Sequence, residues 1–134
     1  MSVLVTDQGF SAPAVVATVS LSNIAAHQGA LDLAQTDDPA QAQPYLSALT
    51  LIRVAFPAFN DGRAFTIARR LRMMGYTGEL RANGPLIADQ YAMARRVGFD
   101  AVEIPDELAA RQPSAQWLSR ANWKSHDYLS RLQT

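Results

Sequence analysis

The sequence predicts a single α/β domain over residues 1–134, built from parallel strand–helix repeats. Three observations favour this class. Strand-like and helix-like segments alternate between residues 29 and 112, as in a parallel sheet with helical crossovers. Apolar residues make up 49% of the chain, which is enough to bury one core without disulfide bonds or metal. Apolar and charged residues also alternate within the expected strands. Helices are therefore expected mainly on one face, in a half-TIM-barrel or a small open parallel sheet.

The N-terminal residues 1–28 are expected to form a hairpin or an irregular segment. Residues 3–5 and 14–21 are rich in β-branched side chains, and Gly9 and Pro13 lie between them. This pattern suits a short hairpin or a pair of edge strands.

Strands and helices then follow one another along the chain. The expected strands are residues 30–34, 49–56, 78–82 and 99–104. The expected helices are residues 39–48, 62–74 and 86–97, a short helix from Pro105, and a C-terminal helix over residues 113–134. A proline or a side-chain cap begins each helix, as at Pro39 and Asp61, and Gly75 and Gly98 end two of them.

One face of the expected sheet is charged. A parallel strand covered on both faces is almost continuously apolar, and these strands are not. The charged residues that share a face are Asp32, Arg53, Glu79, Arg81 and Glu103. On one hypothesis they line a half-barrel that the C-terminal helix or a second subunit closes. The alternative is an open sheet whose charges are solvated or paired across strands.

Ligands of parallel α/β folds bind beyond the carboxyl ends of the strands, which directs attention to the loops there. Asn60, Gly62 and Arg63 begin a helix where backbone amides and a guanidinium could hold a small oxyanion. Arg81 and the turn at Gly84 would add donors. Alternatively, the nearby Asp61 caps its helix and pairs with Arg63 or Arg81.

The catalytic candidates are carboxylates. Glu79, Glu103 and Asp61 could act as acid or base, although Arg53 and Arg81 beside the two glutamates favour ion pairing, which would keep them ionised. Arg53 is also a candidate for binding an anion or a partner.

Several classes of function are not expected. The 12 basic and 12 acidic residues balance, so binding to nucleic acid is not favoured. The chain has no cysteine, its two histidines lack a second ligand at metal spacing, and no glycine-rich nucleotide motif occurs, so we expect no metal and no cofactor. The longest apolar run, residues 14–19, is far too short to span a membrane, which predicts a cytoplasmic protein without a membrane partner.

A longer pattern runs through the middle of the chain. Residues 56–66 read FPAFNDGRAFT, residues 78–82 read GELRA, Asp89 precedes Gln90, and residues 98–100 read GFD. This pattern resembles the bacterial domain of unknown function 934, over about residues 50–103 with weaker agreement back to Ala30. The resemblance implies a protein encoded beside assimilatory sulfite reductase and sometimes labelled an oxidoreductase, and it adds Asp89 and Gln90 to the binding candidates. Pro85 and Val97 depart from the pattern, because an acidic residue and a cysteine often stand there.

Three functions follow as hypotheses, and the sequence leaves open whether the protein is an enzyme. The first is an accessory protein of assimilatory sulfite or sulfate reduction that binds an oxyanion, or a redox partner such as sulfite reductase, through an arginine-lined face. The second is a small half-barrel enzyme, of oxidoreductase or acid–base type, whose site is completed in a homodimer. The third is a structural homodimer without catalysis.

Overall fold

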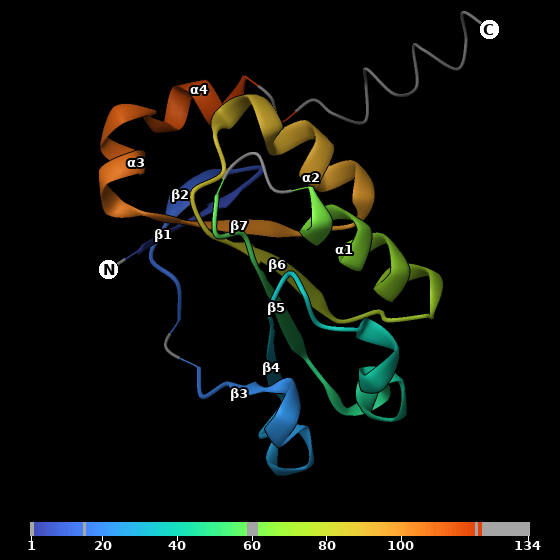
Figure 1. The fold of residues 1–134 in the computed structure, drawn as a ribbon. Coiled ribbons are helices and arrows are strands. Elements are labelled where there is room, and N and C mark those ends of the chain that lie inside the picture. Colours follow the sequence, from blue (N-terminus) through green and yellow to red (C-terminus); the bar gives the residue numbers. More distant parts are fainter. Residues whose placement is uncertain (1, 15, 59–61, 120, 122–134) are drawn as a thin grey trace, which may run out of the picture.

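The computed structural model describes residues 2–14, 16–58, 62–119 and 121 as a seven-stranded sheet with helices (Figure 1). The strands lie in the order β2-β1-β7-β6-β5-β4-β3. Their bounds are β1 (Ser2–Thr6), β2 (Gly9–Ser11), β3 (Val19–Ser20), β4 (Ala30–Leu33), β5 (Leu51–Ala55), β6 (Glu79–Asn83) and β7 (Ala101–Pro105). Strands β3 to β7 are parallel to one another, whereas β1 is antiparallel to both β7 and β2. The predicted α/β class is confirmed, with an open sheet and not a closed barrel.

The helices follow the parallel strands along the chain. They are the 3₁₀ helices η1 (Leu21–Ala26), η2 (Pro39–Ala48) and η3 (Ala88–Gln90), and the α-helices α1 (Arg63–Met73), α2 (Tyr91–Val97), α3 (Asp106–Arg111) and α4 (Ser114–Leu118). Consecutive parallel strands are neighbours from β3 to β7, so right-handed connections return on the same side of the sheet each time. None of the described helices has the length and hydrophobicity that a membrane crossing requires.

The core lies between the apolar face of the sheet and this helix layer. Helix α1 is amphipathic and buries Ala64, Ile67, Ala68 and Leu71 against it. Within this core, the rings of Phe56, Phe65 and Phe99 pack with centroids 5.0 to 6.5 Å apart. The strand residues that belong to this core are Val5, Leu31, Leu33, Ile52, Val54, Leu80, Ala82, Val102 and Ile104.

The helix boundaries agree with the sequence in part. Asp38 caps η2 as expected, because its carboxylate accepts a hydrogen bond from the amide of Ala40 at 3.0 Å. Helix η2 is nevertheless a 3₁₀ helix that contains Pro44, which has no N–H to donate within an α-helix. Gly98 ends α2 in the left-handed conformation, as expected. The helix expected over residues 86–97 begins only at η3.

Both ends of the chain differ from the expectation. Strand β1 pairs with β2, and not with residues 14–21, where β3 is the one strand among the described residues. Strand β3 lies at the opposite edge of the sheet, where it pairs in parallel with β4. Helix α4 begins at Ser114, close to the expected start, and ends at Leu118. The rest of the expected helix over residues 113–134 lies almost entirely outside the described residues.

The turn after β6 passes close beneath the chain that follows β5. Gly84 has a φ of +154°, and a Cβ atom built on it would lie 2.0 Å from the carbonyl oxygen of Phe56. Only glycine permits this approach, which brings the ends of the two strands together. Gly84 is therefore required for backbone packing.

We expect Gly84→Ala to lower the free energy of unfolding by about 2 to 4 kcal/mol, because backbone must move to admit the methyl group. Urea denaturation would measure the change. The control is Gly62→Ala, since nothing lies within 4 Å of the added atom and the φ of Gly62 is −80°. Equal stability of the two variants would contradict the packing argument.

The N-terminal hairpin is held to α2 by a buried tyrosine. The hydroxyl of Tyr91, whose side chain is fully buried, donates to the Asp7 carboxylate at 2.5 Å, and Arg95 also pairs with Asp7. Burial raises the pKa of the Tyr91 phenol above its ordinary value, and the hydrogen bond to Asp7 raises it further. Burial likewise raises the pKa of Tyr76.

A raised phenol pKa predicts a loss of stability at alkaline pH. The stabilisation that comes from keeping the phenol neutral is fully present below the unfolded-state pKa of about 10. It is lost progressively above that pH, because the phenol ionises readily only in the unfolded chain. Each such tyrosine lowers the free energy of unfolding by up to about 1.4 kcal/mol per pH unit. Tyr91→Phe should therefore reduce the alkaline slope, measured by urea denaturation between neutral and strongly alkaline pH. An unchanged slope would show that Tyr91 ionises as easily in the folded protein.

Candidate functional site

The charged residues of the strands form one ion-pair network on the face of the sheet opposite the helices. This charged face consists of Asp32, Arg53, Glu79, Arg81 and Glu103. Strand register puts Asp32, Arg53 and Arg81 side by side across β4, β5 and β6. The prediction that these five residues share a face is confirmed, and their charges are paired across strands.

Arg53 is the centre of the network. Its Nε donates to Asp32 Oδ1 at 2.7 Å and its Nη2 to Asp32 Oδ2 at 2.9 Å, which is a bidentate pair. Its Nη1 reaches past β6 to both carboxylate oxygens of Glu103 at 3.3 Å. The hydrogen bonds that Arg53 donates to Asp32 raise the pKa of Arg53, against an opposing effect of burial. Arg53 therefore links β4, β5 and β7 through one fixed cation.

Arg81 forms the second half of the network. Its Nη2 and Nε donate to Glu79 Oε2 at 2.6 and 2.9 Å, and its Nη1 donates to Glu103 Oε1 at 3.2 Å. Glu103 thus lies between the two guanidinium groups. Its second oxygen also accepts a hydrogen bond from the Ser2 hydroxyl at 2.9 Å. The hydrogen-bond network therefore extends from β7 to β1.

Burial divides the charged face into an inner and an outer part. The side chains of Arg81 and Glu103 are only 7% and 10% exposed, whereas those of Asp32 and Glu79 are 38% and 40% exposed. Three carboxylates meet two guanidinium groups, so the face has an excess of one negative charge, and its most exposed charged groups are carboxylates. The inner pair fixes the geometry, and the outer carboxylates are accessible to a partner.

This arrangement limits the chemistry of the face. Both guanidinium groups are already bound by carboxylates, so an oxyanion would have to displace one of them. The carboxylates likewise accept hydrogen bonds from the guanidinium groups, so their oxygens are already engaged. Among the described residues, no group of three histidine, aspartate or glutamate side chains is placed to hold a metal ion.

The other candidates from the sequence lie elsewhere. Gly62 and Arg63 begin α1 in the helix layer, so Arg63 and Arg81 belong to opposite sides of the sheet. Asp89 and Gln90 lie in η3, where the Gln90 side chain accepts a hydrogen bond from the amide of Ile87 at 3.1 Å. Asn60 and Asp61 lie outside the described residues. Gly84 allows the close backbone contact with Phe56 described above.

Sequence reasoning missed three polar residues on the charged face. Asn83 continues the alternation of Glu79 and Arg81 and pairs in register with Glu103, so the period of two could have identified it. The hydroxyl of Thr18 donates to Asp32 at 2.8 Å, and that of Ser2 donates to Glu103. No sequence signal marks these two, because each depends on which strand becomes the neighbour.

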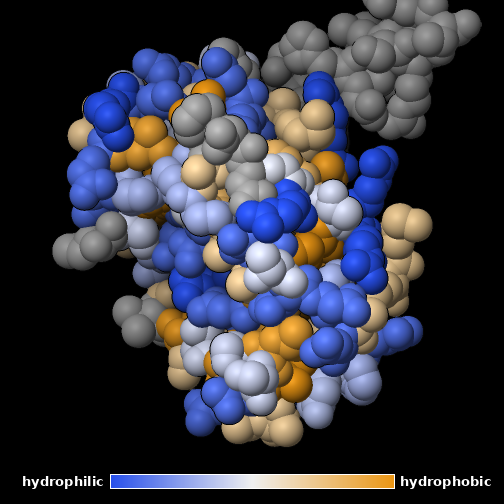
Figure 2. All heavy atoms as spheres, in the orientation of Figure 1, coloured by the Kyte–Doolittle hydropathy of each residue, from blue (hydrophilic) through white to orange (hydrophobic). Residues whose placement is uncertain are grey.

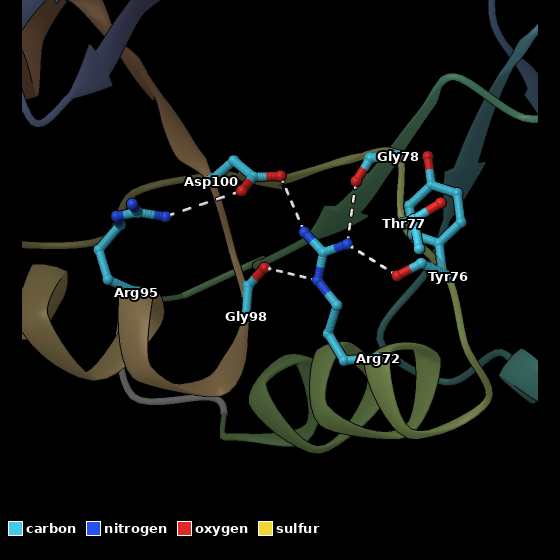
Figure 3. Close-up of a pocket in the computed structure, with 7 residues that line it drawn as sticks. All are labelled: Arg72, Tyr76, Thr77, Gly78, Arg95, Gly98 and Asp100. Carbon is cyan, nitrogen blue, oxygen red and sulfur yellow. Dashed lines mark hydrogen bonds and ion pairs between the residues drawn. The ribbon is translucent and has the colours of Figure 1, made fainter.

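A separate hollow of about 520 Å³ lies at the amino ends of β6 and β7 (Figure 3). Arg72 projects into it from α1 and donates to the carbonyl groups of Tyr76, Gly78 and Gly98 at 2.9 to 3.0 Å. It also pairs with Asp100 at 2.8 Å. Arg72 therefore fastens the end of α1 to the two connections that enter β6 and β7. Residues at this edge of a parallel fold usually serve stability, and these contacts fit that role.

Comparison with known proteins identifies one family. The model of the family described as bacterial protein of unknown function (DUF934) matches residues 30–128. No curated protein and no solved structure is significantly similar to the chain.

The inner pair of the charged face predicts a strong energetic coupling. We expect Arg81→Met to lower the free energy of unfolding by about 3 kcal/mol, because it leaves Glu103 buried beside one cation instead of two. Adding Glu103→Gln should cost less in this background than in the wild type, which a double-mutant cycle measured by urea denaturation would show.

Arg70→Met is the matched control for this cycle. Arg70 pairs with Asp38 at 3.3 Å, and both side chains are about half exposed. The control should therefore cost less than about 1 kcal/mol. Additive effects of the Arg81 and Glu103 substitutions would show that the buried pair is not coupled.

Proposed function

The chain belongs to the DUF934 family, and we propose that it is a non-catalytic accessory protein that binds a partner protein through the charged face of its sheet. The observation that carries this proposal is the charged face itself. Its five side chains are fixed by one another, and its outer carboxylates, Asp32 and Glu79, are exposed. A fixed pattern of charge that ends in exposed carboxylates suits recognition of a complementary surface.

The burial of the charged face favours a protein over a free oxyanion. The guanidinium groups are neutralised, and the exposed carboxylates of Asp32 and Glu79 would repel sulfite or sulfate. The same carboxylates would attract lysine or arginine side chains of a protein. The partner is therefore expected to present a basic patch.

The family resemblance supplies the partner to test first. Because the resembled family is encoded beside assimilatory sulfite reductase, we propose that enzyme as the redox partner. The enzyme alternative has less support, since Glu79 and Glu103 are both bound to Arg81. The homodimer alternative uses the same face, and sedimentation of the purified chain would detect it.

Binding of purified sulfite reductase to the immobilised chain, measured by biolayer interferometry, tests the proposal. We expect Glu79→Gln to slow association roughly three- to tenfold at low salt and to reduce the dependence of the rate on salt. The variant keeps a hydrogen-bonding partner for Arg81 while removing the exposed charge.

Glu107→Gln is the control for this measurement. Glu107 is an exposed carboxylate of α3, outside the charged face, so its neutralisation should leave association unchanged. Absence of binding by the wild type, or equal slowing by both variants, would overturn the proposal.

A further inference from the structure

A second hollow, of about 330 Å³, lies beyond the carboxyl ends of β6 and β7. Its walls are Pro85 and Ile87 from the connection after β6, and Leu108, Arg111 and Gln112 from the region of α3 after β7. This is the edge of a parallel sheet where ligands usually bind. The volume falls at the lower end of the range of about 300 to 1,000 Å³ for small-molecule sites.

The hollow has apolar walls and one charge. Pro85, Ile87 and Leu108 supply the apolar surface, and Figure 2 shows hydrophobic side chains over α3 bordered by hydrophilic ones. Arg111 is the one charged residue among the described residues that line it. An apolar hollow with a single cation suits a ligand with an apolar body and one negative charge.

Arg111 differs from the arginines of the charged face in its contacts. Within the described part of the chain no hydrogen bond or ion pair engages its guanidinium, including with Glu107 one turn earlier in α3. By contrast, Arg53, Arg72 and Arg81 each bind at least one carboxylate. Arg111 thus retains its donors for a ligand.

The wall that carries Arg111 is held in place from two sides. The side-chain oxygen of Gln112 accepts a hydrogen bond from the amide of Ala88 at 2.6 Å, which fixes α3 to η3 across the hollow. The carbonyl oxygen of Gln112 accepts a hydrogen bond from the indole of Trp117 at 2.9 Å. These two hydrogen bonds pre-form this wall of the hollow. The indole N–H of the buried Trp117 also provides an NMR signal that responds to changes at Gln112.

From these contacts we infer that the hollow binds a small organic monoanion, a short-chain carboxylate or sulfonate. Its apolar chain lies on Pro85, Ile87 and Leu108, and its acid group receives hydrogen bonds from Arg111. Arg111 contacts the ligand and selects for a negative charge on it. This site is on a different part of the molecule from the charged face and does not rest on the proposed partner.

The test is a titration of the ¹⁵N-labelled full chain with sodium hexanoate, followed by NMR. Saturable shifts are expected for the indole N–H of Trp117 and the amide of Ala88, because both bond to Gln112. Hexanesulfonate should produce the same shifts, whereas hexylammonium should not. Arg111→Gln should weaken hexanoate binding at least tenfold, since it removes a charge-assisted contact.

Arg96→Gln is the matched control, because Arg96 is an exposed arginine of α2 that does not line the hollow. It should bind hexanoate as the wild type does. The inference is overturned if the shifts do not saturate, if hexylammonium binds as well as hexanoate, or if Arg111→Gln binds with unchanged affinity.

Discussion

A parallel sheet whose connections all return on one side has one face without helices. The stability of this fold depends on the interactions made on that face. Here the face carries two arginines and three carboxylates, which bind one another across β4, β5, β6 and β7. Removing either inner partner would leave a buried charge with too few counterions. The network therefore stabilises this face of the sheet, and its exposed carboxylates give the surface a defined charge pattern.

The arginines in the middle of the chain divide into groups with different tasks. Arg53 and Arg81 neutralise carboxylates on the charged face, while Arg72 binds carbonyl groups at the amino ends of β6 and β7. Arg111 faces a hollow instead. A guanidinium has five donors in a plane, so the same residue type serves ion pairing and backbone fastening equally well. Burial and partners, and not the spacing of arginines, separate a structural role from a binding role.

The sequence predicted what depends on local periodicity and missed what depends on distant neighbours. The alternation around Arg53 and Arg81 identified the charged face, and Gly98 marked the end of α2. The partner of β1 was not predictable from residues 3–5, because any exposed edge with a compatible register satisfies a short strand. Arg81 was expected to meet Arg63, but strand alternation placed it on the other face. The hollow at Arg111 escaped notice because Pro85 and Leu108 come together only when two connections fold against each other.

The position of β1 has a consequence for the order of folding. Val3 pairs with Ile104 and Val5 with Val102, so the first of the described strands finds its place only beside the last of them. During synthesis the N-terminal hairpin therefore waits, with its apolar face unpaired, until almost the whole parallel sheet has been made. Pairing between such distant segments closes a long loop and is slow compared with local contacts. Docking of the hairpin on the β7 edge is therefore expected after the parallel pairs between neighbouring strands have formed.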